Sequence, residues 1–164
     1  ENLSVTRFLC SQAIAMSMQG IPALYFNSLC GARNWIEGRE QTGQNRTVNR
    51  QKWDVDDFEA SLGEVGTIEH RVFSGLRQLL NVRREQAAFH PESGQEVQPF
   101  GESFFAARRT GREGDDVVDC VFNVTGQSRA LPGTLSGTDL ISGEACPAEL
   151  PPFGFAWIVP DSDQ

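Results

Sequence analysis

The sequence predicts two parts of different fold class, an α/β part followed by an all-β part that forms an antiparallel β-sandwich. Up to residue 90, apolar residues recur at helical spacing on both sides of one short, nearly continuous apolar run at residues 21–26. Past Pro91 the period of the apolar positions changes from about 3.6 to about 2, and turn residues recur every several positions. We therefore predict a boundary there, with domains over residues 1–90 and 91–164.

The first helix is predicted over residues 5–18, with apolar residues around much of its circumference. Such a helix needs cover on more than one face. Ser4 can cap its start. Gly20 and Pro22 end it, because glycine accepts the left-handed conformation and proline disfavours helix in the residue before it.

A strand is predicted at residues 21–26 (IPALYF), since a continuous apolar run of this length is typical of a strand covered on both faces of a parallel sheet. The amide and carbonyl groups of such a strand must be paired by neighbours, and the sequence offers no second strand of this kind. We therefore expect residues 1–90 to be one βα unit with its preceding helix, cut from a larger α/β body.

A long loop is predicted over residues 27–53, which are rich in Gly, Asn, Arg and Glu and lack sustained periodicity. Structureless loops of this length are uncommon as mere connectors. In α/β barrels the segments after the carboxyl ends of the strands carry the substrate contacts. Function should therefore concentrate in this loop.

Two helices should follow the loop. Asp54 can cap a short helix that runs through Leu62, and Thr67 can start a longer one. The longer helix has one apolar face and carries three arginines toward its C-terminal end, where they meet the helix dipole favourably. The apolar face consists of Val72, Phe73, Leu76, Leu79 and Leu80, and the arginines are Arg77, Arg83 and Arg84.

The all-β part should begin with a hairpin of residues 95–100 and 103–109 around Gly101-Glu102. Two further strands alternate apolar and polar positions, one with Val118, Cys120, Phe122 and Val124 on its apolar face, the other with Phe153, Phe155, Trp157 and Val159. Weaker strands are predicted near Leu131 and at residues 138–141. Together they predict a small antiparallel sandwich of five to seven strands.

Composition excludes several classes of partner. The chain has 39% apolar and 22% charged residues, a net charge of −8 and no apolar run long enough to span a membrane, so we expect a soluble, cytoplasmic protein. Its acidic surface should repel nucleic acid. No export signal is visible in the sequence as given. The four cysteines are widely spaced without a zinc-ligand pattern, so we expect reduced, mostly buried thiols, no metal and no cofactor.

Residues 21–49, together with Arg50, resemble the last barrel strand and the following loop of glycoside hydrolase family 13, in particular its bacterial sucrose-phosphorylase-like subfamily. The run GIPALYF is similar to the family's G-[IV]-P-x-[IVL]-Y-[YF] entry to the eighth strand. The turn NSLCG and the segment TGQNRTVNR at residues 42–50 are similar to the subfamily's next turn and basic loop. The terminal FGFAWIV is similar to the closing strand of the family's terminal β domain.

This resemblance implies that residues 1–90 are the last βα portion of a TIM (β/α)8 barrel and that residues 91–164 are the C-terminal β-sandwich domain. It also implies a retaining double displacement, in which a carboxylate forms a β-glucosyl-enzyme, a glutamic acid protonates the leaving group, and phosphate releases α-glucose 1-phosphate. The family's three carboxylates lie on the fourth, fifth and seventh strands, which would precede residue 1. We therefore expect no catalytic residue in this chain and no activity from the chain alone.

The acidic residues that follow the loop do not replace those carboxylates. They lie at the start of a short helix, where capping and the helix dipole account for them. These residues are Asp54, Asp56, Asp57 and Glu59.

Arg46 is the strongest candidate site residue. By its place in the loop it resembles the arginine that binds the glucosyl unit in the innermost donor subsite, and a guanidinium suits sugar hydroxyls and a neighbouring carboxylate. The alternative is a solvated loop arginine. Arg50 can contact substrate or brace the loop through salt bridges, and we favour the second role. Asn34, Glu37 and Glu40 can shape the acceptor side, or they can be ordinary polar residues of a solvated loop.

The sequence supports two functional hypotheses of different class, an enzyme and a non-catalytic module. The chain can be part of an α-glucoside phosphorylase, whose partners are an α-glucoside and inorganic phosphate, or part of a family 13 hydrolase or transglucosidase. It can instead be a non-catalytic carbohydrate-binding or stabilising β module, which should show exposed aromatic residues on one sandwich face. The alternation of Phe153, Phe155 and Trp157 favours the enzyme. The chain by itself is expected to self-associate.

Overall fold

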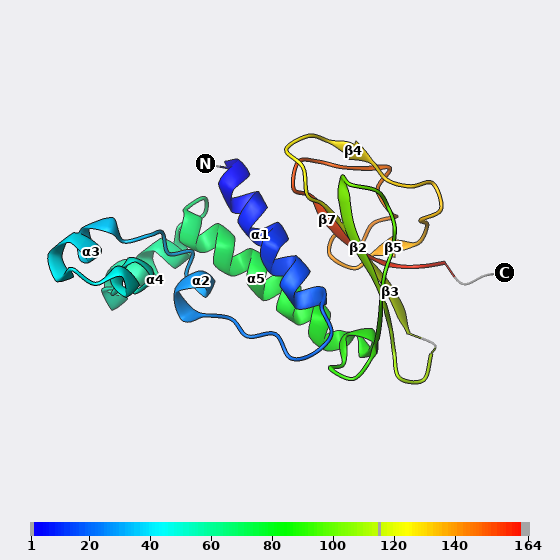
Figure 1. The fold of residues 1–164 in the computed structure, drawn as a ribbon, viewed down its shortest axis with the longest axis horizontal. Helices are drawn as coiled ribbons and strands as arrows, with labels where there is room; N and C mark the ends of the chain where they lie inside the picture. The colour runs from blue at the N-terminus through cyan, green and yellow to red at the C-terminus, as the bar shows by residue number, and fades with distance from the viewer. Residues whose placement is uncertain (1, 115, 162–164) are drawn as a thin grey trace. The chain divides into compact units, whose positions relative to one another are not determined.

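The computed structural model describes residues 2–114 and 116–161. The elements in chain order are α1 (Asn2–Ser17), α2 (Phe26–Leu29), α3 (Ile36–Thr42), the 3-10 helix η1 (Asn45–Asn49), α4 (Val55–Gly63), α5 (Ile68–Glu85), the 3-10 helix η2 (Ala87–Phe89), β1 (Gly94–Val97), β2 (Phe104–Thr110), β3 (Val117–Asn123), β4 (Arg129–Ala130), β5 (Thr138–Asp139), β6 (Glu149–Leu150) and β7 (Phe155–Val159) (Figure 1). Packing divides the chain into two compact units, one of Glu1–Pro22 with Gln78–Gln164 and one of Ala23–Arg77.

The strands of the first unit form two antiparallel sheets. The larger sheet has the order β1-β2-β3-β7-β5, and β4 pairs with β6 in a two-stranded sheet. The hairpin predicted around Gly101-Glu102 is confirmed, because β1 pairs with β2 in a register that sets Gly94 opposite Thr110. The weaker strands are present as two-residue segments. The prediction of five to seven antiparallel strands is thus confirmed for the described residues.

One face of the larger sheet builds an apolar core with the second sheet and its loops. Ala106, Val121, Ala156 and Ile158 are almost fully buried on this face, together with Leu150 of β6. Half-buried apolar residues pack around them, namely Phe100, Phe104, Leu131, Leu135 and Cys146. These central positions were not among those predicted to face the core.

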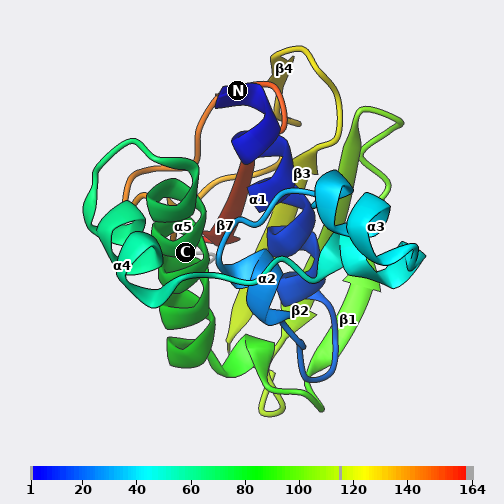
Figure 2. The ribbon, with the colours of Figure 1, turned by 90° about the vertical axis from the view of Figure 1, so that its left-hand side faces the viewer.

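The opposite face of the sheet carries Val118, Cys120, Phe122 and Trp157 of the predicted apolar set, and helices cover it, whereas Val124 follows β3 and is 42% exposed. Helix α1 lies against β3 (Figure 2), and the Phe89 ring of η2 lies 4.7 Å from the Trp157 ring, centre to centre. Cys120 and Trp157, which pair across β3 and β7, are both fully buried. The alternation of apolar and polar positions predicts one exposed face for each of these strands, and this is wrong for β3 and β7, since the helices and the second sheet bury both of their faces.

Two arginines are buried on the helix-covered face without a carboxylate partner among the described residues. Arg83 donates to the main-chain oxygens of Met16, Gly20 (2.9 Å) and Phe89 (3.0 Å). Both guanidinium groups also lie over the Phe89 ring, with Arg83 5.3 Å and Arg109 5.9 Å from its centre. Burial lowers the pKa of both arginines, and the carbonyl oxygens supply the polar contacts that a buried cation requires.

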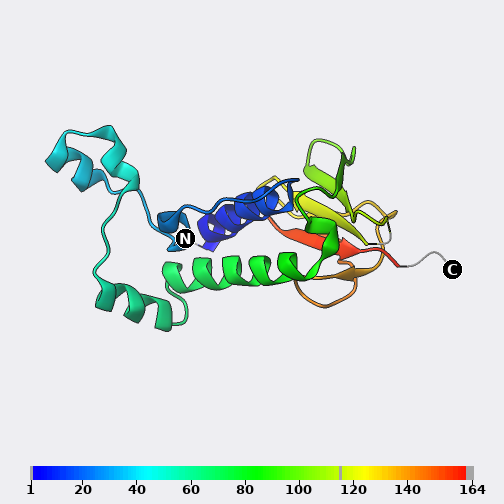
Figure 3. The same cartoon turned by 90° about the horizontal axis from the view of Figure 1, so that it is seen from below.

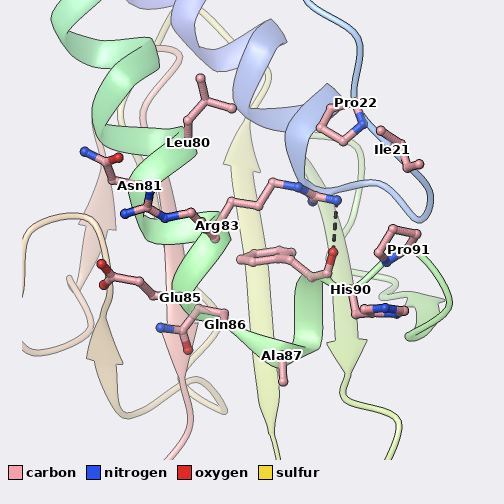
Figure 4. A pocket seen from close by; sticks show the side chains of 12 residues that line it. Ile21, Pro22, Leu80, Asn81, Arg83, Glu85, Gln86, Ala87, His90 and Pro91 are labelled. Carbon is pink, nitrogen blue, oxygen red and sulfur yellow. Dashed lines mark hydrogen bonds between the residues drawn. The ribbon is translucent and has the colours of Figure 1, made fainter.

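Arg83 also lines a hollow of about 690 Å³ at the end of α5, together with Pro22, Leu80 and Pro91 (Figure 4). The predicted apolar face of this helix is largely confirmed, because Val72, Leu76 and Leu79 are buried. The basic residues in its last turn are Arg83 and Arg84, as predicted.

The segment up to residue 26 departs from the prediction at two points. Helix α1 begins at Asn2, so Ser4 lies inside the helix and does not cap it. Gly20 takes the predicted left-handed conformation, with φ of 106°. The strand predicted at residues 21–26 is absent, since residues 21–25 belong to no strand and Phe26 begins α2. Ile21 is 84% and Tyr25 54% exposed. A strand exists only through pairing with neighbours, and no strand among the described residues lies beside this segment.

The assignment of residues 1–90 to a barrel and of residues 91–164 to a separate domain stays a prediction. The compact units follow packing rather than sequence order, because α1 and the end of α5 belong to the unit that contains the sheets. Within the part of the chain that the structure describes, no helix has both the length and the apolar character needed to cross a membrane.

Candidate functional site

The predicted loop at residues 27–53 lies in the second unit and is not structureless. It contains most of α2 and all of α3 and η1. These helices span four to seven residues, fewer than the three turns or so over which helical periodicity becomes visible. The cyan segment at the left of Figure 3 is the lobe that α3 and η1 form, and extended stretches connect it to α2 and α4.

The lobe, defined as residues 35–49, is held together by its own contacts. The main-chain N–H of Trp35 donates to the main-chain oxygen of Val48 (2.8 Å), and the Oγ1 atoms of Thr42 and Thr47 lie 2.8 Å apart. Gly38 is buried under the Trp35 ring, where a Cβ atom would collide with that ring. Gly43 ends α3 in the left-handed conformation, with φ of 67°. The Trp35 indole therefore packs on α3, and this packing requires a glycine at position 38, three residues after the tryptophan.

Arg46 lies exposed within η1. Its Nε donates to Oε1 of Gln44 at 2.9 Å, a bond that uses one of the five guanidinium donors. The neighbouring Asn45 accepts from Arg39 Nε at 3.0 Å. The short helix thus fixes the backbone of Arg46 while its side chain stays accessible.

The other predicted site residues lie on the same lobe or at its edges, and all are exposed. Asn34 precedes the lobe, Glu37 and Glu40 belong to α3, and Arg50 follows η1. The packing of α3 against η1 brings both glutamates and Arg46 into one small body. Arg50 forms no salt bridge within the described residues, so its bracing role stays a prediction. Its main-chain N–H donates to the Thr47 oxygen at 3.0 Å.

Asn27 is the residue at this site that the sequence analysis missed. It is 8% exposed, and its Nδ2 donates to the main-chain oxygens of Asn49 (3.1 Å) and Gln51 (3.2 Å). Its Oδ1 accepts from Trp53 Nε1 at 3.3 Å. The signal that could have revealed it is a single amide directly after an apolar run, because a polar group that becomes buried must find partners.

A hollow of about 350 Å³ opens beside this amide, with a lining that is mostly polar. It is formed by Tyr25, Asn27, Ser28, Ala32, Arg33, Asn34 and Asn49. The Tyr25 hydroxyl donates to the Asn49 oxygen at 3.1 Å. Hydroxyl, amide and guanidinium groups of this kind are able to bind a polyhydroxylated ligand. Among the described residues no cluster of His, Cys, Asp and Glu suits a metal ion.

Comparison with known proteins gives consistent relatives. The chain is 40% identical over 119 residues to a glucosylglycerate phosphorylase of Spirochaeta thermophila, which covers 73% of this chain and 20% of the relative. It is 33% identical over 159 residues to one of Allomeiothermus silvanus, covering 97% of this chain and 28% of the relative. The chain therefore spans about a quarter of the length of these curated relatives. No family model matches it.

Solved structures share the fold at low sequence identity. A maltogenic amylase from S. marinus superimposes with a TM-score of 0.65 at 11% identity, covering 93% of this chain and 19% of that one. The trehalulose synthase MutB superimposes with a TM-score of 0.66 at 16% identity, covering 94% of this chain and 38% of that one. At such identities these matches concern the fold alone.

Fold and sequence together define the class of this protein as the α-amylase type, glycoside hydrolase family 13. Within that family the chain belongs to the sucrose-phosphorylase-like group and corresponds to part of such an enzyme.

Proposed function

We propose that the protein to which this chain belongs is an α-glucoside phosphorylase that acts on glucosylglycerate and inorganic phosphate. The observation that carries this proposal is the identity of 33% over 97% of the chain to a glucosylglycerate phosphorylase. The candidate substrates of a phosphorylase in this subfamily are sucrose, sucrose phosphate and glucosylglycerate. Both of the phosphorylases described above carry the glucosylglycerate name, which favours the last.

In this proposal the chain supplies a sugar-binding loop and a terminal β part. Arg46 contacts the glucosyl unit, because an exposed guanidinium on a short fixed helix can donate to sugar hydroxyls and lie beside a carboxylate. Asn34, Glu37 and Glu40 shape the acceptor side, and Arg50 braces the end of η1. Residues 1–90 complete the catalytic barrel, and residues 91–164 form its terminal domain.

The proposed chemistry takes place on carboxylates outside this chain. A carboxylate displaces glycerate from the anomeric carbon to give a β-glucosyl-enzyme, while a carboxylic acid protonates the departing oxygen. Phosphate then attacks the same carbon and releases the enzyme carboxylate, which yields α-glucose 1-phosphate with retained configuration. Hydrolysis would use water at this second step, so the acceptor decides between phosphorylase and hydrolase.

A non-catalytic carbohydrate-binding module fits the structure less well. Such a module presents exposed aromatic rings to sugar, whereas Trp157 is fully buried and the Phe122 ring lies among those of Phe105 and Phe155. The aromatic residues of β2, β3 and β7 therefore serve packing. This supports a structural β part within an enzyme.

The proposal is tested with the full-length protein, glucosylglycerate and phosphate. Release of α-glucose 1-phosphate that depends on phosphate is the expected result, with sucrose and sucrose phosphate as comparison substrates. Free glucose as the main product at saturating phosphate would replace the phosphorylase with a hydrolase. No turnover of glucosylglycerate beside rapid turnover of sucrose would overturn the substrate assignment.

A further inference from the structure

One buried side chain, that of Asn27, forms hydrogen bonds with the C-terminal end of the lobe at residues 35–49 and with the segment that follows it. The return segment that leaves the lobe passes Asn27, whose carboxamide makes three hydrogen bonds to it: two to the main-chain oxygens of Asn49 and Gln51 and one from the Trp53 indole. The Asn27 carboxamide thereby uses both of its N–H donors and its oxygen.

The residues around Asn27 fix its position in turn. The Asn27 main-chain oxygen accepts from Ala32 N–H at 2.8 Å, which closes the turn after α2. The Trp53 ring lies 5.0 Å from the Phe58 ring of α4, centre to centre. Tyr25 adds a second donor to the Asn49 oxygen at 3.1 Å. The carboxamide is therefore held between two anchored segments, α2 on one side and the start of α4 on the other.

We propose that Asn27 is a positioning residue for the sugar-binding loop, acting on Arg46 through the Asn49 carbonyl. Asn49 is the last residue of η1, and Arg46 belongs to the same five-residue helix. Hydrogen bonds to the end of so short a helix fix the backbone from which the Arg46 side chain extends. This inference rests on the proposed function, because Arg46 must contact substrate for its position to matter.

The reaction rate depends on where the substrate-binding side chains lie, since a displacement of about 1 Å remote from the chemistry can lower the rate about a hundredfold. The side chain of Asn27 need not touch substrate for this effect. A Gln, Ser or Ala at position 27 could not reach all three partners in the same geometry, because the three bonds need a planar amide of this length.

The test uses Asn27→Ala and Arg46→Ala, singly and together, in the full-length protein. We expect Asn27→Ala to lower kcat/KM for glucosylglycerate by about ten- to a hundredfold, and to speed amide exchange at residues 45–49. In the Arg46→Ala background the same substitution should change kcat/KM by less than about twofold. The control Gln51→Ala keeps the gripped carbonyl and should keep kcat/KM within about threefold of wild type.

The outcomes separate this inference from the proposed function. Unchanged amide exchange at residues 45–49 in Asn27→Ala would show that Asn27 does not hold η1 in place. Faster exchange with wild-type kcat/KM, or an equal loss in both backgrounds, overturns positioning and leaves a purely structural role. If Arg46→Ala alone leaves kcat/KM unchanged while exchange in Asn27→Ala rises, the assignment of Arg46 to the sugar site is wrong and the route through Arg46 falls with it.

Discussion

The guanidinium of Arg109 donates to the main-chain oxygen of Ser17 at 2.8 Å, across 92 positions of sequence. Ser17 is the last residue of α1, and Arg109 lies in β2. The last carbonyls of a helix have no partner within it, so a strand residue completes the end of α1. The same guanidinium reaches the oxygens of His90 (3.1 Å) and Gly94 (3.0 Å). One buried side chain thus joins the first helix to the sheet.

Arg109→Lys should lower the free energy of unfolding of the chain by about 2–3 kcal/mol, because an ammonium keeps the charge but cannot reach all these oxygens, and unpaired buried polar groups are costly. Urea unfolding followed by circular dichroism measures the change. Arg77→Lys, at an exposed position of α5, is the matched control and should change the free energy by less than about 0.5 kcal/mol. Equal stability of Arg109→Lys and wild type would show that the hydrogen bonds from the Arg109 guanidinium to these oxygens do not stabilise the fold.

Arg46→Ala in the full-length protein should lower kcat/KM sharply and leave the fold intact. Losing a charge-assisted contact to the sugar costs roughly 2–4 kcal/mol of transition-state binding, or about thirty- to a thousandfold in rate. Arg112→Ala, which removes an exposed arginine 3.4 Å from Glu92, is the control and should be neutral. Kinetics of Arg46→Ala within a factor of about three of wild type would reassign Arg46 to a surface role.

The chain by itself should not release glucose 1-phosphate from any α-glucoside and phosphate, because the family's nucleophile and acid are expected outside it. The measurement is product formation by the purified chain over a long incubation, compared with a heat-treated sample. Turnover above that background, retained through further purification, would show that residues of this chain carry out the reaction.

The chain by itself should also self-associate. Ile21 is 84%, Tyr25 54% and Phe26 57% exposed within a six-residue segment, and apolar surface of this kind favours association. Sedimentation across a concentration series measures it. Ile21→Glu should shift the equilibrium toward monomer, whereas Val65→Glu, which starts from the same 84% exposure, should shift it less. A compact monomer with strongly protected amides at residues 21–26 would show that this segment needs no partner.

The thiols should be unreactive near neutral pH. Burial raises the pKa of Cys10 from about 9 to about 11, and it raises the pKa of Cys120 as well. Since the thiolate is the reactive form, iodoacetamide at pH 8 should leave both cysteines unmodified in the folded chain and modify them in urea. Rapid modification of Cys10 in the folded chain would contradict its burial.

A pH dependence of stability follows from the same shift. The folded state holds the Cys10 proton to a higher pH than the unfolded state does, so the stabilisation is fully present below pH 9 or so and is lost as the pH rises toward 11. The free energy of unfolding should therefore fall across that interval. Cys10→Ala should flatten part of the slope, and an unchanged slope would assign it to other groups.

The sequence by itself determined the elements whose causes are local. Asp54 accepts from the amides of Asp56 and Asp57 at the start of α4, as its capping position predicts. Thr67 accepts from the His70 amide at the start of α5. The hairpin of β1 and β2 and the burial of Val72, Leu76 and Leu79 likewise follow from turn residues and periodicity. The resemblance of residues 21–50 to family 13 also needed only the order of the residues.

Only the tertiary structure decided features that depend on partners distant in sequence. Residues 21–25 have the composition of a buried strand but pair with no strand of the described part of the chain, because composition cannot supply the neighbouring ladder. The apolar face of β3 and β7 was predicted, but whether helices or a second sheet cover it depends on where α1 and η2 pack. The hydrogen bond from Asn27 to the Asn49 oxygen joins segments 22 residues apart, and the hydrogen bond from Arg109 to the Ser17 oxygen joins segments 92 residues apart. A polar side chain in a sequence shows that it can form hydrogen bonds, and the folded backbone decides which distant carbonyls it meets.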